Sequence, residues 1–251
     1  MNRSVILMYH LVDHAQSERE RRFCTPPGEF RRQMEWLIRA GYQPVALGDI
    51  AAGRERAVHI TFDDGFACVL EHAAPVLREL GLPATMFAVS GRLGRTNDWM
   101  TARGYPERPL LSAEGLHTLR EYGFSIGSHT RSHARLTDLD PVAAHDEIAG
   151  SKTELEDRLG VEVRYFAYPY GKENPVVRDL VVDSGYAGAC STRSGFNRPG
   201  DDSFLLRRID IFGTDRLWQF RQKIAWGINE ASRLYPLKYY RGRIAARIGR
   251  T

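Results

Sequence analysis

Short apolar runs alternate with longer amphipathic stretches along most of this 251-residue chain. Seven runs have the length and composition of buried strands: residues 4–10, 58–62, 84–89, 125–129, 165–169, 187–191 and 205–211. Five stretches between them have helical spacing and end at a glycine: residues 27–40, 68–80, 112–122, 141–159 and 175–184. This alternation is typical of βα units, so we expect an α/β fold, a distorted barrel of about seven parallel strands with its chemistry at the carboxyl ends of the strands.

The chain is long enough for one large domain followed by a basic tail. Residues 213–251 contain nine Lys or Arg and two acidic residues, a net charge of +7, whereas the whole chain carries +4. The other residues therefore sum to −3, and the basic character is confined to the C-terminal part. We expect one barrel domain over residues 1–212 and a basic amphipathic helix or tail over residues 213–251.

Composition also narrows the class of protein. The three cysteines are widely spaced, which fits neither a disulfide framework nor a zinc cluster, so we expect free thiols in a reducing compartment. The apolar residues 5–8 are too few for a secretory leader, and no run approaches eighteen apolar residues. These features predict a cytoplasmic protein.

Two adjacent carboxylates, Asp63 and Asp64, follow the apolar run at residues 57–60. Asp-Asp-Gly is common turn chemistry, and a solvated turn is one interpretation. In a dry site, however, the repulsion between two such charges raises one pKa strongly unless a cation or a fixed donor separates their roles. A metal ion on one carboxylate would leave the other free as a base.

His129 and His133 begin at the end of another expected strand, four residues apart, and we expect a helical turn to bring them onto one face. The spacing alone is also common among surface histidines. Two imidazoles and one carboxylate facing one cavity supply three ligands to a divalent cation and leave a position open for water, which is the arrangement of a catalytic site.

A third motif, Phe166-Ala167-Tyr168-Pro169-Tyr170-Gly171, also lies at a strand end. Together and in this order, the three motifs resemble those of the polysaccharide deacetylase family, also called the NodB-homology carbohydrate esterases. The likeness covers roughly residues 5–211, and the third motif together with Tyr9-His10 resembles the branch associated with exopolysaccharides and poly-N-acetylglucosamine.

The resemblance implies Asp63 as general base and Asp64, His129 and His133 as metal ligands. It implies that Pro169 and Tyr170 line the substrate groove, with the backbone N–H of Tyr170 helping to hold the oxyanion. It also implies a divalent metal ion, with Zn²⁺ favoured and Co²⁺ or Ni²⁺ as the other choices.

The chain departs from the family pattern at two places. The third motif lacks its arginine, and we expect Arg207 or Arg208 to replace it, with Arg208 counted among the substrate-binding candidates. The family's late general-acid histidine is also missing, because no histidine follows His145. His10, at the end of the first expected strand, is the candidate acid; a structural histidine bonded to the backbone is the other interpretation.

Two regions bear on substrate and partners. Trp99, in the long segment 91–109, could stack on a sugar ring or pack within its loop. The tail could rest on anionic lipid at the inner membrane face or form a final helix packed over the barrel; no recognition motif accompanies its charge, so we do not expect nucleic acid as a partner.

The sequence therefore predicts a metal-dependent hydrolase that removes N-acetyl groups from a sugar in a polysaccharide or lipid-linked glycan. A hydrolase of the same fold that cleaves a non-sugar amide, and a degenerate member that only binds glycan, are the alternatives.

Overall fold

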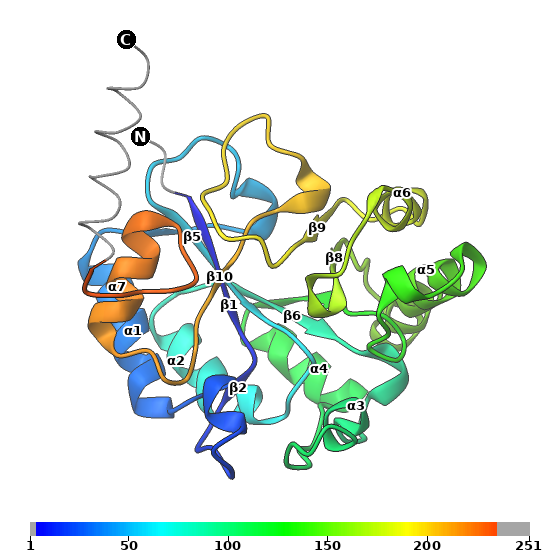
Figure 1. The fold of residues 1–251 in the computed structure, drawn as a ribbon, viewed down its shortest axis with the longest axis horizontal. Helices are drawn as coiled ribbons and strands as arrows, with labels where there is room; N and C mark the ends of the chain where they lie inside the picture. The colour runs from blue at the N-terminus through cyan, green and yellow to red at the C-terminus, as the bar shows by residue number, and fades with distance from the viewer. Residues whose placement is uncertain (1–3, 235–251) are drawn as a thin grey trace.

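Seven parallel strands form the central sheet in the order β10-β1-β5-β6-β7-β8-β9 in a computed structural model, which describes residues 4–234 (Figure 1). The strands are β1 (Val5–Tyr9), β5 (Ala57–Phe62), β6 (Ala84–Ala88), β7 (Phe124–Ser128), β8 (Tyr165–Ala167), β9 (Gly188–Cys190) and β10 (Ile209–Asp210). An additional short strand, β4 (Gln43–Pro44), pairs with the start of β5. All seven expected strands are present and the barrel architecture is confirmed; most of the strands are shorter than expected.

The barrel closes through the segment that leads into β10. Leu206 exchanges backbone hydrogen bonds with Ala189 and Ser191 beside β9, and the Arg208 N–H donates to the carbonyl of Arg193. Immediately afterwards β10 pairs with β1, with Met8 opposite Asp210. Residues 206–210 therefore join the last strand to the first.

Helices cover the outside of the sheet (Figure 1). The main ones are α1 (Pro27–Arg39), α2 (Ala74–Glu79), α4 (Ala113–Glu121), α5 (Pro141–Leu159), α6 (Pro175–Asp183) and α7 (Leu217–Trp226). The side chains of Ser112, Asp140 and Asn174 accept hydrogen bonds from backbone N–H groups in the first turns of α4, α5 and α6, as N-cap residues do.

The expected helix over residues 68–80 is not a continuous α-helix. It begins as a π-helical turn, η3 (Val69–Ala73), and becomes α2 at Ala74. Pro75 explains the change, because its ring nitrogen cannot donate the hydrogen bond that a regular helix needs at that position.

The shorter elements lie in the connecting segments. They are β2 (Leu11–Val12), β3 (Cys24–Thr25), α3 (Asp98–Thr101) and the one-turn helices η1 (Glu20–Arg22), η2 (Leu47–Asp49), η4 (Ser90–Arg92), η5 (Leu136–Asp138), η6 (Pro169–Gly171) and η7 (Ser203–Leu205).

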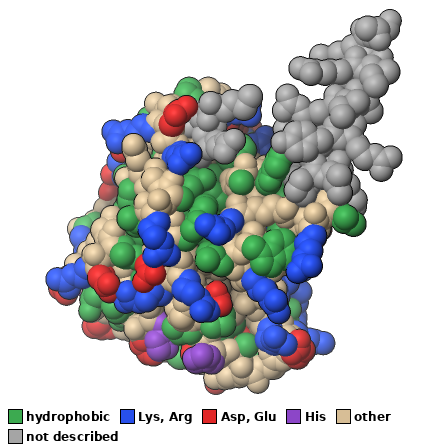
Figure 2. Space-filling model, turned by 90° about the vertical axis from the view of Figure 1, so that its left-hand side faces the viewer, with side chains coloured by type: hydrophobic (Ala, Val, Ile, Leu, Met, Phe, Trp, Pro, Cys, Tyr) green, Lys and Arg blue, Asp and Glu red, His purple; other side chains and the backbone are tan. Residues whose placement is uncertain are grey.

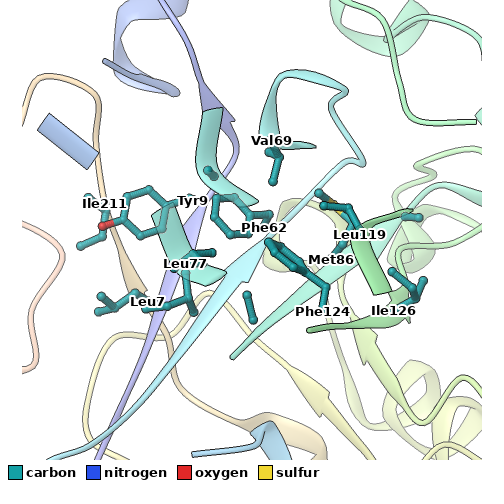
Figure 3. Close-up of a cluster of buried hydrophobic side chains, with 14 of the residues drawn as sticks. Leu7, Tyr9, Phe62, Val69, Leu77, Met86, Leu119, Phe124, Ile126 and Ile211 are labelled. Carbon is teal, nitrogen blue, oxygen red and sulfur yellow. The ribbon is translucent and has the colours of Figure 1, made fainter. Parts of the chain in front are cut away.

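Alternate residues of each strand face the two sides of the sheet. Leu7, Tyr9 and Phe62 point outward into a large core shared with the helices, where they pack with Leu77 and Leu119 (Figure 3). The residues between them face the barrel interior. There an apolar layer is formed by Ile6, Ala57, Phe87, Ala167, Cys190 and Leu206 with Val45, Leu47 and Ile50. The next inward positions toward the carboxyl ends are polar, and these carry the site.

The first part of the expected tail packs on the barrel. Phe220 and Ile224 of α7 are buried, and Phe220 lies edge-on to Trp36 of α1. Lys223 is also buried, in an ion pair with Asp215, so it does not belong to an exposed basic face as expected. The helix ends at Gly227, which has a φ of 65°, and residues 235–251 of the tail lie outside the described residues.

On the face that carries α1 and α7, Lys and Arg side chains are interspersed with hydrophobic and acidic ones (Figure 2). Among residues 4–234, none of the helices combines the length and the hydropathy that crossing a bilayer requires.

Candidate active site

The expected site residues meet at the carboxyl ends of the strands. Asp63 and Asp64 follow β5, His129 follows β7 and His10 follows β1. Because Asp63 and His129 continue the inward alternation of their strands, both point into the barrel mouth. They line a pocket of about 350 Å³ together with Met8, His10, Phe23, Asp64, Met100, Arg103, Tyr105, His133, Tyr168, Tyr170, Thr192, Asp210 and Asn229.

Asp64, His129 and His133 bring three ligand atoms together. Oδ1 of Asp64 lies 3.0 Å from Nε2 of His133 and 3.5 Å from Nε2 of His129. Metal bonds of about 2.0–2.1 Å in tetrahedral geometry separate neighbouring ligand atoms by about 3.3 Å. All three side chains are buried, and the set is the arrangement of a metal centre.

The surrounding hydrogen bonds support that assignment. Nδ1 of His129 lies 2.7 Å from the Ala167 carbonyl, which accepts only if Nδ1 carries the proton. The lone pair of the neutral ring is then on Nε2, facing Asp64. Among the described residues, Oδ1 of Asp64 and Nδ1 of His133 are buried without a hydrogen-bond partner. The three residues therefore fit a divalent cation.

Burial and neighbouring charges shift the pKa values of these groups in opposite directions. Burial lowers the pKa of His129 to about 4, so the ring is neutral at physiological pH, as a ligand must be. Burial opposes ionisation of Asp64, but the neighbouring histidines, His133 foremost, outweigh it and hold the pKa of that carboxyl well below its usual range.

The segment between the two histidines is not the helical turn that was expected. Thr130 and His133 have φ values of 67° and 63°, in the left-handed region, and the Thr130 hydroxyl accepts a hydrogen bond from the His133 N–H. Glu147 of α5 accepts hydrogen bonds from the N–H groups of Arg131 and Ser132, at 3.0 and 2.9 Å, and from the Ser132 hydroxyl at 2.7 Å. One carboxylate thus fixes the turn that presents His133.

Most of the strained backbone conformations lie at this site. In the described chain the non-glycine residues with positive φ are Arg56, Asp64, Thr130, His133 and Tyr170, and all except Arg56 belong to the three motifs. Such conformations persist where the surrounding structure imposes them, often at functional sites.

Arg208 takes the place next to Asp63 that the missing arginine of the third motif was expected to fill. Both guanidinium nitrogens Nη1 and Nη2 of Arg208 donate to the carboxylate of Asp63, at 2.6 and 2.8 Å, and Arg208 is fully buried. Burial opposes ionisation of Asp63, but Arg208 and then His129 outweigh it and lower the pKa of this carboxyl. Arg208 therefore lies behind Asp63, away from the pocket wall on which a substrate-binding residue was expected.

His10 is partly buried at the pocket wall and packs edge-on against Phe23. Across the β1–β10 pair, Asp210 lines the same pocket, and its Oδ1 has no partner among the described residues. Burial raises the pKa of Asp210, whereas His10 and Lys223 act against the rise. Sequence reasoning missed Asp210. Its position two residues after Arg208, on the same inward side of β10, was the available signal.

The aromatic candidates occupy different places around His133. Tyr170 lines the pocket and lies edge-on to His133, with ring centroids 4.6 Å apart; its φ of 58° comes from the turn in which Pro169 is buried. Trp99 stacks on His133 at 4.7 Å, with the ring planes 12° apart. Trp99 thus packs against a candidate ligand from another segment, which neither interpretation predicted, and a stack on sugar remains a proposal.

Comparison with known proteins identifies relatives of this chain. The polysaccharide deacetylase family model matches residues 51–189. YxkH of Bacillus subtilis is 28% identical over 213 residues, which cover 82% of this chain and 70% of YxkH. The poly-beta-1,6-N-acetyl-D-glucosamine N-deacetylase of Staphylococcus epidermidis is 26% identical over 196 residues, covering 72% of this chain and 65% of that protein.

A solved structure shares the fold over most of both chains. IcaB from Ammonifex degensii superposes with a TM-score of 0.74 and 26% identity, covering 89% of this chain and 96% of IcaB. With the family model matching more than half of its residues, this chain belongs to the polysaccharide deacetylase family.

Proposed function

We propose that this protein is a metal-dependent N-deacetylase that hydrolyses the N-acetyl amide of a sugar in a polysaccharide or lipid-linked glycan. The main observation behind this proposal is that the two adjacent aspartates have different partners. Arg208 holds the carboxylate of Asp63, whereas Asp64 faces the two histidines. A base thus stands beside a three-ligand metal site in one pocket, and the relatives that act on poly-N-acetylglucosamine support the choice of substrate.

Zn²⁺ is the metal that we propose for the site, with Co²⁺ or Ni²⁺ as substitutes. Two imidazole nitrogens and one carboxylate oxygen are a donor set that zinc accepts, and the fourth position remains open. When bound, such a cation lowers the pKa of a coordinated water and polarises the acetyl carbonyl.

Asp63 accepts the proton of the attacking water in this proposal. Its lowered pKa keeps the carboxyl ionised at neutral pH, and the two hydrogen bonds from Arg208 fix the direction in which its oxygens point. The backbone N–H of Tyr170 is the candidate donor to the oxyanion that develops on the acetyl group.

His10 protonates the leaving amine in this proposal. The imidazole lies on the pocket wall that also carries the carboxyl group of Asp210. The closure of the barrel brings these two residues together, so the acid comes from the first strand and its partner from the last.

Neither alternative function gains an observation from the structure. Asp63, Asp64, His129 and His133 form one complete buried set, which a protein that only binds glycan does not need. The relatives named as sugar N-deacetylases favour a sugar amide over another amide.

Release of acetate from N-acetylglucosamine oligomers tests the proposal, with zinc or cobalt added and a chelator as control. We expect Asp63→Asn to abolish turnover while the protein still binds the metal, and Asp64→Ala and His133→Ala to lose both. Asp157→Asn on the exposed face of α5 is the matched control. Full metal binding and full activity in the three site variants would falsify the assignment.

We further propose that the protein works in the cytoplasm and that its tail contacts anionic lipid at the inner membrane face. The charge of +7 on residues 213–251 supports this contact. A truncation at residue 213 would remove buried residues of α7, so the test compares the full chain with one ending at Leu234. Equal flotation of both with anionic liposomes would reject the tail as the contact.

A further inference from the structure

Two arginines flank the aromatic ring that forms one wall of the pocket. The guanidinium carbon of Arg135 lies 4.7 Å from the centroid of Tyr170, and that of Arg103 lies 5.8 Å from the same centroid. Tyr170 in turn lies edge-on to His133. Arg103 lines the pocket that holds the candidate metal ligands, and Arg135 contacts the same Tyr170 ring from outside the lining residues. The Tyr170 ring thus separates both arginines from His133, and a sugar next to the N-acetylated one is the part of a substrate that we expect to meet them.

Neither arginine is neutralised by a carboxylate. Within residues 4–234, no ion pair joins Arg103 or Arg135 to an acidic side chain, whereas Arg92, Arg108, Arg131, Arg193 and Arg208 each have such a partner. Of the three carboxyl groups that line the pocket, Asp63 is held by Arg208, Asp64 faces the histidines and Asp210 lies on the wall that carries His10. A bound divalent cation would make this wall more positive still.

The segment that carries Arg103 is fixed in place. Nη1 of Arg19 donates to the carbonyl of Arg103 at 2.5 Å. The following residue, Gly104, has a φ of 77°, and a Cβ there would meet the same guanidinium at 2.7 Å. Further along, the buried Arg108 forms ion pairs with Glu20 and Asp13. Arg103 is thus presented to the pocket from an anchored loop.

A guanidinium that contacts an aromatic ring can still present N–H groups that match the oxygens of a carboxylate or phosphate in bidentate geometry. The Arg103 side chain also hydrogen-bonds the Tyr170 hydroxyl, so only its remaining N–H groups can bind the anion. We infer that Arg103 and Arg135 form an anion subsite beside Tyr170, and that the glycan substrate carries a carboxylate or phosphate on the sugar next to the N-acetylated one. This inference rests on the proposed deacetylase function and specifies its substrate class.

The test compares three trisaccharides of N-acetylglucosamine that differ only at C6 of a terminal sugar: the neutral compound, its carboxylate and its phosphate. The readout is the ratio of kcat/KM for each anionic compound to that for the neutral one, with metal added. We expect the wild type to prefer one anionic compound by about five- to tenfold. The better of the two identifies the chemistry of the substituent, and added salt should reduce the preference.

Arg103→Gln and Arg135→Gln should each lower this ratio toward one, mainly through KM. Arg103→Lys should keep part of the preference, since it retains the charge without the planar fork. Arg54→Gln, at an exposed arginine beyond the opposite ends of the strands, should leave the ratio unchanged. Equal kcat/KM on all three compounds in the wild type overturns the anion subsite but leaves the deacetylase function standing. Failure to release acetate from any of them overturns the function itself.

Discussion

Arg208 and Asp63 lie 145 residues apart in the sequence, yet they form a fully buried bidentate pair at 2.6 and 2.8 Å. The pair exists because residues 206–210 close the barrel between β9 and β1, which aims Arg208 across the interior at the end of β5. It assigns the two adjacent aspartates to different tasks, since Arg208 holds the carboxylate of Asp63 whereas Asp64 faces the two histidines.

Replacing Arg208 by Gln should move the acid side of the pH–activity profile to higher pH. Burial by itself raises the pKa of Asp63, and without the guanidinium less of this carboxyl is ionised at neutral pH. Breaking a buried pair of this kind costs about 3–5 kcal/mol of stability. The measurements are kcat/KM against pH and urea unfolding. Arg207→Gln, at the exposed neighbour, is the control; an unchanged profile in Arg208→Gln would show that Arg208 does not set the ionisation of Asp63.

Glu147→Gln should weaken metal binding about tenfold, because groups that orient ligands affect affinity on that scale. The carboxylate accepts three hydrogen bonds from Arg131 and Ser132 in the turn that presents His133, and the amide can accept at only one of its two positions. Competition with a chromophoric zinc chelator measures the affinity. The matched control is Asp146→Asn, whose exposed carboxylate pairs with the Arg131 side chain from the adjacent position of α5. Similar affinities in both variants would contradict the positioning role of Glu147.

Trp99→Ala should also lower metal affinity, and Trp99→Phe should lower it less. The indole covers one face of the His133 ring at 4.7 Å, so its removal leaves the ligand free to tilt. Cobalt titration followed by visible absorption reports both affinity and ligand geometry. Trp218→Ala, at the exposed tryptophan on α7, is the control. If metal binding survives Trp99→Ala while KM for the oligomer rises, Trp99 contacts sugar instead.

Stability of the metal-free protein should fall between about pH 6.5 and pH 4. His59 lies in the barrel interior, where burial lowers its pKa to about 4 from an ordinary value of 6.5. The unfolded chain therefore takes up the proton first as the pH falls, and the stability present above pH 6.5 is lost progressively, up to about 3 kcal/mol for this group. Urea unfolding at pH 7 and pH 5 with chelator measures the loss. This loss of stability between pH 7 and pH 5 should be smaller in His59→Gln. It should be unchanged in His145→Gln, which replaces an exposed histidine.

Gly160 and Gly171 have the same φ of 63°, so replacing each by alanine distinguishes the cost of backbone strain from the cost of a steric clash. Gly160 ends α5 in open space, whereas a Cβ on Gly171 would meet the Thr192 hydroxyl at 1.9 Å. Gly160→Ala should cost about 1 kcal/mol. Gly171→Ala should cost more and also reduce activity, because it displaces the turn that holds Tyr170. The measurements are the free energy of unfolding and the rate of acetate release for both variants. An equal loss of stability with full activity in both would contradict the role of this turn.

The sequence determined the local features of this protein. Apolar runs that alternate with helices ending at a glycine predicted the barrel, because these signals act between residues close together in the chain. The aspartate pair and the two histidines were recognisable because each motif lies at the end of its own strand. The helical turn predicted for residues 129–133 was wrong. Glu147 on α5 accepts hydrogen bonds from the N–H groups of Arg131 and Ser132, and the residues on either side of this pair have left-handed backbone.

Tertiary structure alone decided which distant residues complete the site. Arg208 reaches Asp63, and Asp210 comes to the pocket wall that carries His10, only because β10 pairs with β1. Trp99 was a candidate for sugar, yet the fold of its loop places it on His133. The sequence named Arg207 and Arg208 as candidates but could not choose between them, because barrel closure sets such contacts through the register of the first and last strands. The sequence alone identified the carboxylates of Asp63 and Asp64 as a candidate pair. Only the fold shows that the guanidinium of Arg208, from the other end of the domain, binds Asp63 and so distinguishes the proposed base from the proposed ligand.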